Sequence, residues 1–423
     1  MKTKLFSLLL VLPMLVFCAP DNIEPDNKPD QEQQDTTQTP PADTTQQEAP
    51  APEPPVEEED TRAPEVKDGD IILVTNSDVQ KFLEDVHYDN HDYSHTELLT
   101  WAETNGVMVS PGKSYMPPTF TIRWEAKADV GEIIATLTEG SWTRDYTIAA
   151  GGSYVEITNL VPNAHYSYIV KGGETVLTGG KFETYGTVRQ LYMKTEIRNC
   201  RDLGGWKTTD GKTVRYRMIY RGGRFDSGSL STSGKTNFKA EGIKAQLDLR
   251  GKKHNDVIEN KEDSPLADIY DLNDFEFCAP IIEEGYTYLL KEEEKTRQVI
   301  QFIMDCVETD KPVYFHCSLG RDRTGTVAML VLGVLGVPEG DISQEYELTQ
   351  FAPHGWATSK GEKTKMTRLA DYDDAANYIW DNFVAEGESF RDGVEKYLLS
   401  IGITQEDIDT FRANMLVDAP AAE

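Results

Sequence analysis

Cysteines, basic residues and long apolar runs are scarce in this sequence, and each scarcity excludes a class of protein. The five cysteines form no Cys-x-x-Cys pair and none lies beside histidines at metal-ligand spacing, so neither a disulfide scaffold nor a zinc site is indicated. We therefore expect mostly free thiols and no metal or other cofactor. Lysine and arginine number 42 against 72 aspartates and glutamates, and this excess of acid argues against non-specific nucleic-acid binding.

An apolar run from Leu5 to Phe17 follows two lysines at the start of the chain. It is shorter than the roughly 20 residues that span a bilayer, but its length and basic front predict an export signal. Leu15 and Val16 before Cys18 resemble a bacterial lipoprotein signal, in which the cysteine is lipidated, although Phe17 departs from the small residue usual there. We expect residues 1–18 to be this signal and the protein to be an exported, membrane-anchored lipoprotein of the bacterial cell envelope, periplasm-facing or at the cell surface. A soluble exported protein is the alternative.

Residues 19–66 consist almost entirely of proline, acidic residues, glutamine, threonine and alanine. Such a segment cannot bury enough apolar surface to offset the entropy of ordering, so we expect a disordered tether. About twelve units of the formal net charge of −30 lie in it, and the rest of the chain is still acidic. An anionic substrate must therefore bind in a local basic pocket.

Residues 67–106 and 107–186 have different patterns. The first range suggests a strand at Asp70 to Val74 and a helix at Ser77 to Val86, capped by Ser77 or Asp78. In the second, short strands with alternating apolar residues recur every 8 to 12 residues, which is typical of a small β-sandwich. Trp124, Leu160 to Pro162 and Tyr166 resemble the fibronectin type III pattern, so we interpret this region as a spacer or ligand-presenting module.

Residues 187–418 alternate between strands and helices. Buried strands are predicted at Ile243 to Arg250 and at Val313 to His316, and Glu294 to Glu308 has an apolar helical face. The stretch from Thr324 to Gly336 is apolar all round, as expected of a helix packed on a sheet. We predict an α/β domain with a central, mainly parallel sheet flanked by helices and preceded by the small all-β sandwich.

The loop between the second strand and the apolar helix reads HCSLGRDRTG, from His316 to Gly325. Backbone amides that curl toward a helix N-terminus form an anion site of the size of a phosphate. The same field favours the thiolate of Cys317, which is the nucleophilic form. Arg323 can hold two phosphate oxygens through its planar guanidinium.

Neighbouring residues have supporting roles in this hypothesis. His316 is expected to order the loop through hydrogen bonds, and the Thr324 hydroxyl can donate to the thiolate. Gly320 permits backbone angles that a side chain would forbid. A Cys-x5-Arg spacing alone is a weak signal, but here it lies between a buried strand and an apolar helix together with Gly320 and a Thr-Gly pair.

This segment resembles the active-site loop of the protein tyrosine phosphatase superfamily, in particular the bacterial tyrosine, dual-specificity and phosphoinositide phosphatases whose loop reads HCxAGKDRTG. Further similar stretches are RNCRDLGGW at Arg198, MIYRGGRF at Met218, LDLR at Leu247 and the C-terminal helical segment. Departures from the family pattern are Leu319 for alanine, Arg321 for lysine and Cys200 for phenylalanine or leucine.

The resemblance implies a metal-free, two-step hydrolysis through a cysteinyl-phosphate. Cys317 would be the nucleophile and Arg323 the phosphate clamp. The backbone amides from Ser318 through Arg323, with those of Leu319, Gly320 and Arg321 between them, would complete the cradle. The general acid is Asp322 or Asp248. We favour Asp322 as the acid, with Asp248 orienting the loop or an arginine. A purely structural pairing of Asp248 with Arg250 or Arg323 is the alternative, and Asp271 and Asp274 are weaker candidates for the acid.

The substrate is left open between phosphotyrosine, phosphoinositides and inositol polyphosphates of the phytase kind. Arg321 adds a second cation, which suits a multiply charged substrate, but it can equally pair with Asp322. The basic run Ser359 to Arg368 is either a lid that contacts anionic headgroups or a solvated surface. A catalytically weak module that only binds phosphorylated ligands is a further alternative. Cys200 could form a reversible disulfide with Cys317, although a buried apolar cysteine is the simpler interpretation.

Overall fold

The computed structural model describes most of the chain beyond its N-terminal segment. The described residues are 63–88, 96–107, 114–194, 197–225, 230–251, 258–282, 286–354 and 370–418. Thr61–Glu423 forms one compact unit. The expected export signal with Cys18, nearly all of the expected tether, and the basic run at 359–368 lie outside the described residues. Within the described ranges, no helix combines the length and the apolar character needed to cross a membrane.

A five-stranded sheet lies at the centre of the C-terminal part, with the strand order β12-β11-β13-β10-β8. The neighbours from β12 to β10 run parallel, and only β8 is antiparallel to β10. This sheet is therefore mainly parallel, as the alternation of strands and helices predicts. The strands are β8 (Arg201–Asp202), β10 (Ile219–Gly222), β11 (Ala245–Asp248), β12 (Glu276–Cys278) and β13 (Val313–His316).

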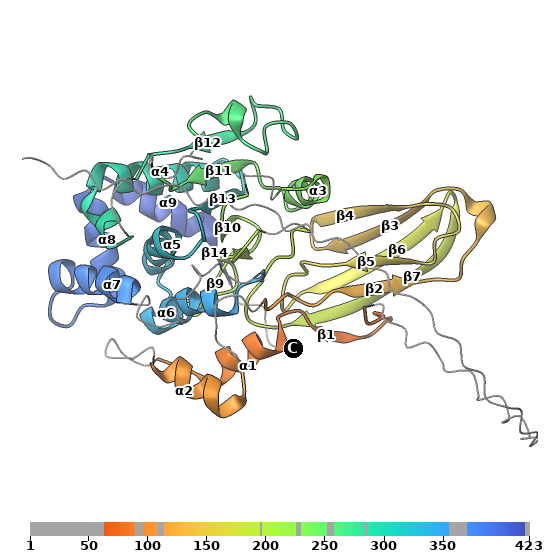
Figure 1. The fold of residues 1–423 in the computed structure, drawn as a ribbon, viewed down its shortest axis with the longest axis horizontal. Helices are drawn as coiled ribbons and strands as arrows, with labels where there is room; N and C mark the ends of the chain where they lie inside the picture. The colour runs from red at the N-terminus through yellow and green to blue at the C-terminus, as the bar shows by residue number, and fades with distance from the viewer. Residues whose placement is uncertain are drawn as a thin grey trace, which may run out of the picture. The chain divides into compact units, whose positions relative to one another are not determined.

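Helices cover this sheet, and the apolar helix α5 (Asp322–Leu335) is buried along its whole length. Figure 1 shows α4 (Glu293–Glu308), α5 and α9 (Gln405–Met415) packed together beside the strands. The residues predicted for the apolar face of α4 are buried, including Val299 and Ile303. The other helices of this part are α3 (Thr232–Ala240), α6 (Glu339–Glu347), α7 (Ala370–Phe383) and α8 (Phe390–Ser400), and β9 (Lys212–Val214) pairs with β14 (Leu416–Asp418). Short 3-10 turns lie at Lys261–Asp263, Tyr286–Lys291 and Leu348–Phe351.

The N-terminal strands form two further sheets around a separate apolar cluster. One has the order β1-β7-β6-β3-β4 and the other pairs β2 with β5. Their core contains Trp124 and Tyr166, and the Tyr166 hydroxyl accepts a hydrogen bond from the Val161 amide at 2.8 Å. The strands are β1 (Ile71–Leu73), β2 (Phe120–Arg123), β3 (Ile133–Glu139), β4 (Trp142–Ile148), β5 (Tyr154–Ile157), β6 (His165–Gly172) and β7 (Thr175–Tyr185), with a 3-10 turn at Ala128–Val130.

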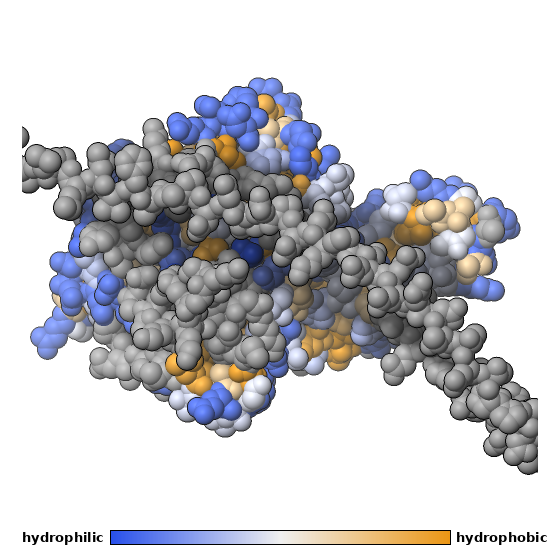
Figure 2. Space-filling model, viewed as in Figure 1, coloured by the Kyte–Doolittle hydropathy of each residue, from blue (hydrophilic) through white to orange (hydrophobic). Residues whose placement is uncertain are grey.

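Two helices, α1 (Ser77–Asp85) and α2 (Thr96–Asn105), belong to the core of the α/β part. Phe82 on α1 stacks on Phe351 with 5.0 Å between ring centroids. The expected cap of α1 was wrong, because Asn76 caps the helix: its side chain accepts from the amides of Asp78 and Val79. Figure 2 shows hydrophilic residues over most of the visible described surface, with small apolar areas among them.

Candidate functional site

The HCSLGRDR loop connects the end of β13, at His316, to the start of α5, at Asp322. The helix thus begins two residues earlier than the sequence suggests. Gly320 has φ +70°, and a Cβ there would come within 2.3 Å of the Gly222 carbonyl carbon. Only glycine allows this close approach of the loop to β10. Tight packing against a neighbouring strand therefore fixes the loop's path.

Several hydrogen-bond donors in the loop are buried without a partner among the described residues. These are the Arg323 Nε, the Ser318 Oγ and the Thr324 Oγ1. The other end of the Arg323 guanidinium donates to the Leu249 carbonyl at 3.1 Å. Buried unpaired donors are costly, and a bound anion is the partner that would satisfy three of them at once. Cys317, 6% exposed, lies at the start of the same loop.

His316 is fully buried and hydrogen-bonded through both ring nitrogens. Its Nδ1 lies 3.1 Å from the Cys317 carbonyl and its Nε2 lies 3.0 Å from the Gln246 amide nitrogen. Ser264 in turn donates to the Gln246 side-chain oxygen at 2.5 Å. Because a carbonyl oxygen can only accept, Nδ1 carries a proton and donates to the Cys317 carbonyl, so His316 orients the backbone at the cysteine.

Asp248, at the end of β11, is held by Arg250 through both carboxylate oxygens, at 2.7 to 3.1 Å. Both side chains are completely buried. Burial alone would raise the pKa of Asp248, but the charge of nearby His316 and the hydrogen bonds from Arg250 outweigh burial, so its pKa is lowered. This is the pairing with Arg250 that the sequence left as one alternative.

Asp322 and Arg321 form a two-pronged ion pair at the start of α5. The Arg321 Nε and Nη2 lie 2.6 and 2.9 Å from the two carboxylate oxygens of Asp322. The Tyr346 hydroxyl also donates to Asp322, at 3.1 Å. Both side chains are nearly inaccessible to solvent, so Asp322 neutralises the positive charge of Arg321 within the loop.

The remaining candidates are placed as follows. Leu319 is half-buried and continues the loop backbone, and the Ser318 carbonyl accepts from the Arg224 amide at 3.2 Å. Asp274 pairs with Lys244, at the opposite end of β11 from Asp248, and so lies away from the loop. In the described ranges, no group of three or more histidines, cysteines or carboxylates is arranged to hold a metal ion.

Cys200 and Cys317 lie in different apolar clusters. Cys200 is fully buried, and burial raises the pKa of its thiol. A redox-sensitive cysteine has the opposite character, with an accessible thiolate. The placement favours the simpler interpretation of Cys200 as an apolar core residue, and all four cysteines in the described ranges are free thiols.

A buried set of charged residues beneath the loop was missed by the sequence reasoning. We call Asn199, Arg201, Arg221, Glu345 and the Gly320 carbonyl the loop network. Arg221 donates to the Gly320 carbonyl at 2.6 Å and pairs with Glu345 at 2.5 Å, and Arg201 pairs with the other oxygen of Glu345 at 2.6 Å. The side-chain amide of Asn199 also donates to the Gly320 carbonyl, at 2.7 Å.

The loop network holds the loop on the side that faces β10. Because two donors hold the Gly320 carbonyl on the side of β10, that peptide unit cannot rotate freely. Burial and the nearby charge of Arg201 lower the pKa of Arg221 to about 10, partly offset by Glu345 and Cys317. A sequence signal existed for the two arginines: Arg201 and Arg221 lie in RNCRDLGGW and MIYRGGRF, two of the stretches that resemble the phosphatase family.

Sequence comparisons relate this chain to tyrosine phosphatases. The model of a tyrosine phosphatase family matches residues 193–417, which is more than half of the chain. A candidate tyrosine-protein phosphatase of Cupriavidus necator is 27% identical over 196 residues, covering 41% of this chain and 66% of that protein. A tyrosine-protein phosphatase of Nostoc commune is 28% identical over 132 residues, covering 28% of this chain and 43% of that protein.

Two solved structures were also matched. The core catalytic domain of the PP-IP phosphatase SIW14 from S. cerevisiae, in complex with citrate, is 13% identical with a TM-score of 0.24, covering 36% of this chain and 76% of that one. TpbA of P. aeruginosa is 13% identical with a TM-score of 0.27, covering 51% of this chain and 97% of that one. At these scores neither superposition carries an argument about the present chain.

Proposed function

This chain belongs to the tyrosine phosphatase family, and from that premise we propose that it hydrolyses phosphate monoesters through a cysteinyl-phosphate intermediate. The observation that carries the proposal is the set of buried, unpartnered donors on Ser318, Arg323 and Thr324, in the same loop as Cys317. These donors match the needs of a phosphate group, which has several oxygens and no hydrogens to donate at neutral pH.

In the first step, the Cys317 thiolate attacks phosphorus and the bond to the leaving oxygen breaks. The general acid gives its proton to that oxygen, while Arg323 and the loop amides hold the non-bridging oxygens. In the second step, water attacks the phosphorus, the sulfur–phosphorus bond breaks, and the carboxylate takes a proton from the water. Inorganic phosphate leaves, and the thiolate and the acid are restored.

We assign the general acid to Asp322 and a positioning role to Asp248. An acid must carry a proton when the leaving group departs, and the lowered pKa of Asp248 opposes this. Asp322 directly precedes Arg323 at the helix start. Its carboxyl group also accepts hydrogen bonds from Arg321 and Tyr346, so it must contact the substrate in addition to these two residues.

For the substrate, we propose phosphotyrosine in proteins. The argument for a multiply charged substrate from Arg321 loses support, because that side chain is paired with Asp322. Phosphoinositides and inositol polyphosphates are the alternatives. Phosphate release from phosphotyrosine peptides, a phosphoinositide and inositol hexakisphosphate, compared by kcat/KM, distinguishes the three classes.

Hydrolysis of p-nitrophenyl phosphate tests the mechanism. We expect Cys317→Ser to lower kcat/KM by at least about 10³-fold, and Arg323→Lys to lower it strongly because lysine lacks the planar fork. Cys278→Ser, at a free buried cysteine on β12, is the matched control and should retain activity. Equal rates for Cys317→Ser and the unchanged protein would reject the mechanism and favour a phosphate-binding module.

We also propose, from residues 1–18 alone, that the protein is exported and anchored by a lipid on Cys18. Growth of an expressing bacterium with radiolabelled palmitate should label the unchanged protein but not Cys18→Ser. Equal labelling of both proteins contradicts the anchor, and an unlabelled but exported protein supports the soluble alternative.

A further inference from the structure

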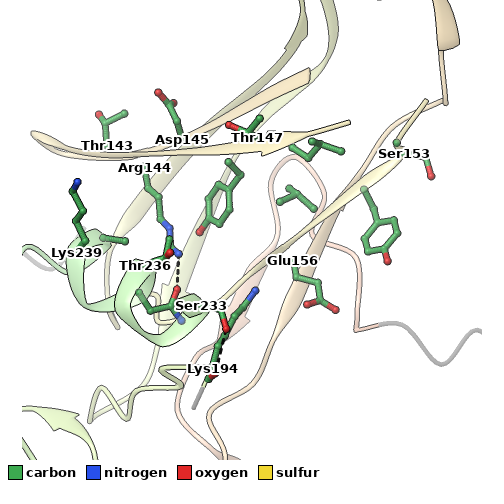
Figure 3. A pocket seen from close by; sticks show the side chains of 17 residues that line it. Thr143, Arg144, Asp145, Thr147, Ser153, Glu156, Lys194, Ser233, Thr236 and Lys239 are labelled. Carbon is green, nitrogen blue, oxygen red and sulfur yellow. Dashed lines mark hydrogen bonds between the residues drawn. The ribbon is translucent and has the colours of Figure 1, made fainter. Parts of the chain in front are cut away.

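A groove of about 990 Å³ lies between helix α3 and two strands of the N-terminal sheets. Residues of β4 and β5 form one side and residues of α3 the other, with Lys194 at the lower end in Figure 3. None of the residues proposed for catalysis lines it. Its volume is in the range of known ligand sites, about 300 to 1,000 Å³.

Both strands in the groove are edge strands. β4 is the last strand of its sheet, hydrogen-bonded only to β3, and β5 pairs only with β2 in the described part of the chain. The free edge of such a strand presents a row of backbone N–H and C=O groups, which is a template for another extended chain. β4 spans seven residues and contains no proline, and Arg144 and Asp145 are its two charged residues.

Positive side chains gather at the groove in a protein that is acidic overall. Lys194 and Lys239 line it and make no ion pair in the ranges that the structure describes. Arg144 points from β4 toward α3 and donates to the Asn237 side chain at 2.9 Å (Figure 3). Two carboxylates, Asp145 and Glu156, also line the groove, so three positive and two negative side chains give it a small positive excess. Against a formal net charge of −30 for the whole chain, this excess favours an acidic occupant.

An unsatisfied polar group also lies in the groove wall. The Tyr146 hydroxyl is buried and has no hydrogen-bond partner among the described residues. Burial raises the pKa of Tyr146 to about 12, so the hydroxyl keeps its proton and can donate. The Arg144 guanidinium lies 4.7 Å from the centre of the Tyr146 ring. A ligand with an acceptor group at this point would satisfy the hydroxyl.

We propose that the groove binds an extended, acidic segment of a partner polypeptide by strand addition to the edges of β4 and β5. Backbone hydrogen bonds would supply affinity, and alternate side chains of the segment would face the lysines and arginine. At about 3.3 Å per residue, seven residues of β4 can pair with a segment of roughly six or seven residues. This binding is separate from catalysis and does not depend on the proposed phosphatase mechanism.

The test uses the full chain and a synthetic probe, the fluorescent peptide acetyl-Thr-Glu-Val-Glu-Ile-Glu-Thr-amide. A second peptide carries N-methyl groups on alternate amides, which removes strand pairing but keeps the side chains. We expect the first peptide to bind and the methylated one to bind at least about tenfold more weakly. Hydrogen exchange should slow in β4 and β5 when the first peptide is present and stay unchanged in α8.

Charge variants complete the test. Lys194→Glu combined with Lys239→Glu should lower the affinity for the peptide at least about tenfold. Lys171→Glu, at an exposed lysine on β6 outside the groove, should leave that affinity unchanged. Phosphatase activity should be the same in the unchanged protein, in the double variant and in Lys171→Glu. The proposal is overturned if no peptide binds, if methylation leaves the affinity unchanged, or if binding protects neither β4 nor β5.

Discussion

Two buried clusters of arginine and carboxylate meet at the short strand β8, and they differ in charge balance. Arg201 and Asp202 are consecutive in β8, so their side chains point to opposite faces of the sheet. Arg201 enters the loop network with Arg221 and Glu345. Asp202 enters a second cluster, which we call the junction network, with Arg189, Glu241 and Arg217.

The junction network is balanced and the loop network is not. Two arginines face two carboxylates in the junction network, and although burial opposes the charge of Arg189, the nearby Glu241 raises its pKa above the usual value. In the loop network Glu345 alone faces Arg201 and Arg221, and the pKa of Arg221 is lowered. A buried excess of positive charge is costly by itself, but here it lies behind the loop that we propose holds phosphate and a thiolate.

The largest effect is expected from removing the carboxylate of the loop network. Glu345→Gln leaves two buried arginines without a counter-charge and loosens the hold on the Gly320 carbonyl. We expect kcat/KM for p-nitrophenyl phosphate to fall about 100-fold and the free energy of unfolding to fall by about 3–5 kcal/mol. Activity is measured well below the unfolding temperature of the variant, and stability by urea denaturation.

Glu347→Gln is the matched control for this prediction. Glu347 lies in the same helix and is fully buried, and its two carboxylate oxygens, 2.9 and 2.7 Å away, share the single hydrogen that the Tyr88 hydroxyl donates. Its replacement should reduce stability while kcat/KM stays within about twofold. Unchanged activity in Glu345→Gln would show that the loop holds its shape without the network.

The elements nearest the loop were predictable from the sequence because their signals are local. The strand at Val313–His316 is a short apolar run, and the helix Glu293–Glu308 has a clear apolar face. Cys317 and Arg323 lie within seven residues of each other, so a single motif indicates both.

The loop network was not predictable in this way, because its partners are far apart in the chain. Arg221 and Glu345 are 124 positions apart, and no periodicity relates them. Their pairing follows from the packing of α6 against β10 and the loop, which only the folded chain shows. The sequence could indicate that each buried charge needs a partner, but not which one.

The junction network should affect stability without affecting catalysis. Glu241→Gln removes the carboxylate that Arg189 contacts at 2.6 Å, so we expect a loss of about 3–5 kcal/mol in unfolding free energy at neutral pH. kcat/KM should stay within about twofold when measured on the folded protein. A large loss of activity in the fully folded Glu241→Gln variant would mean that the two networks are coupled through β8.

The same variant should change the acid sensitivity of the protein. Burial would raise the pKa of Glu241, but Arg189 and Arg217 outweigh burial and lower it. A carboxyl whose folded pKa is lowered stabilises the protein above its unfolded value of about 4.3 and loses this contribution as the pH falls through the folded value. Urea denaturation at neutral pH and at about pH 3.5 should therefore show a smaller acid-induced loss in Glu241→Gln than in the unchanged protein.

The smallest effect is expected where the junction network meets the N-terminal sheets. The Arg217 guanidinium lies 3.8 Å from the centre of the Trp142 ring and 3.4 Å from Glu139. Arg217→Lys keeps the charge but loses the planar face, so we expect urea denaturation to show a loss of about 1 kcal/mol. Arg215→Lys, at an exposed pair with Asp310, should change stability by less than about 0.5 kcal/mol. If Arg217→Lys instead destabilises the protein as much as Glu241→Gln, the stacked arginine, and not the buried carboxylate, is the main stabilising group of the junction network.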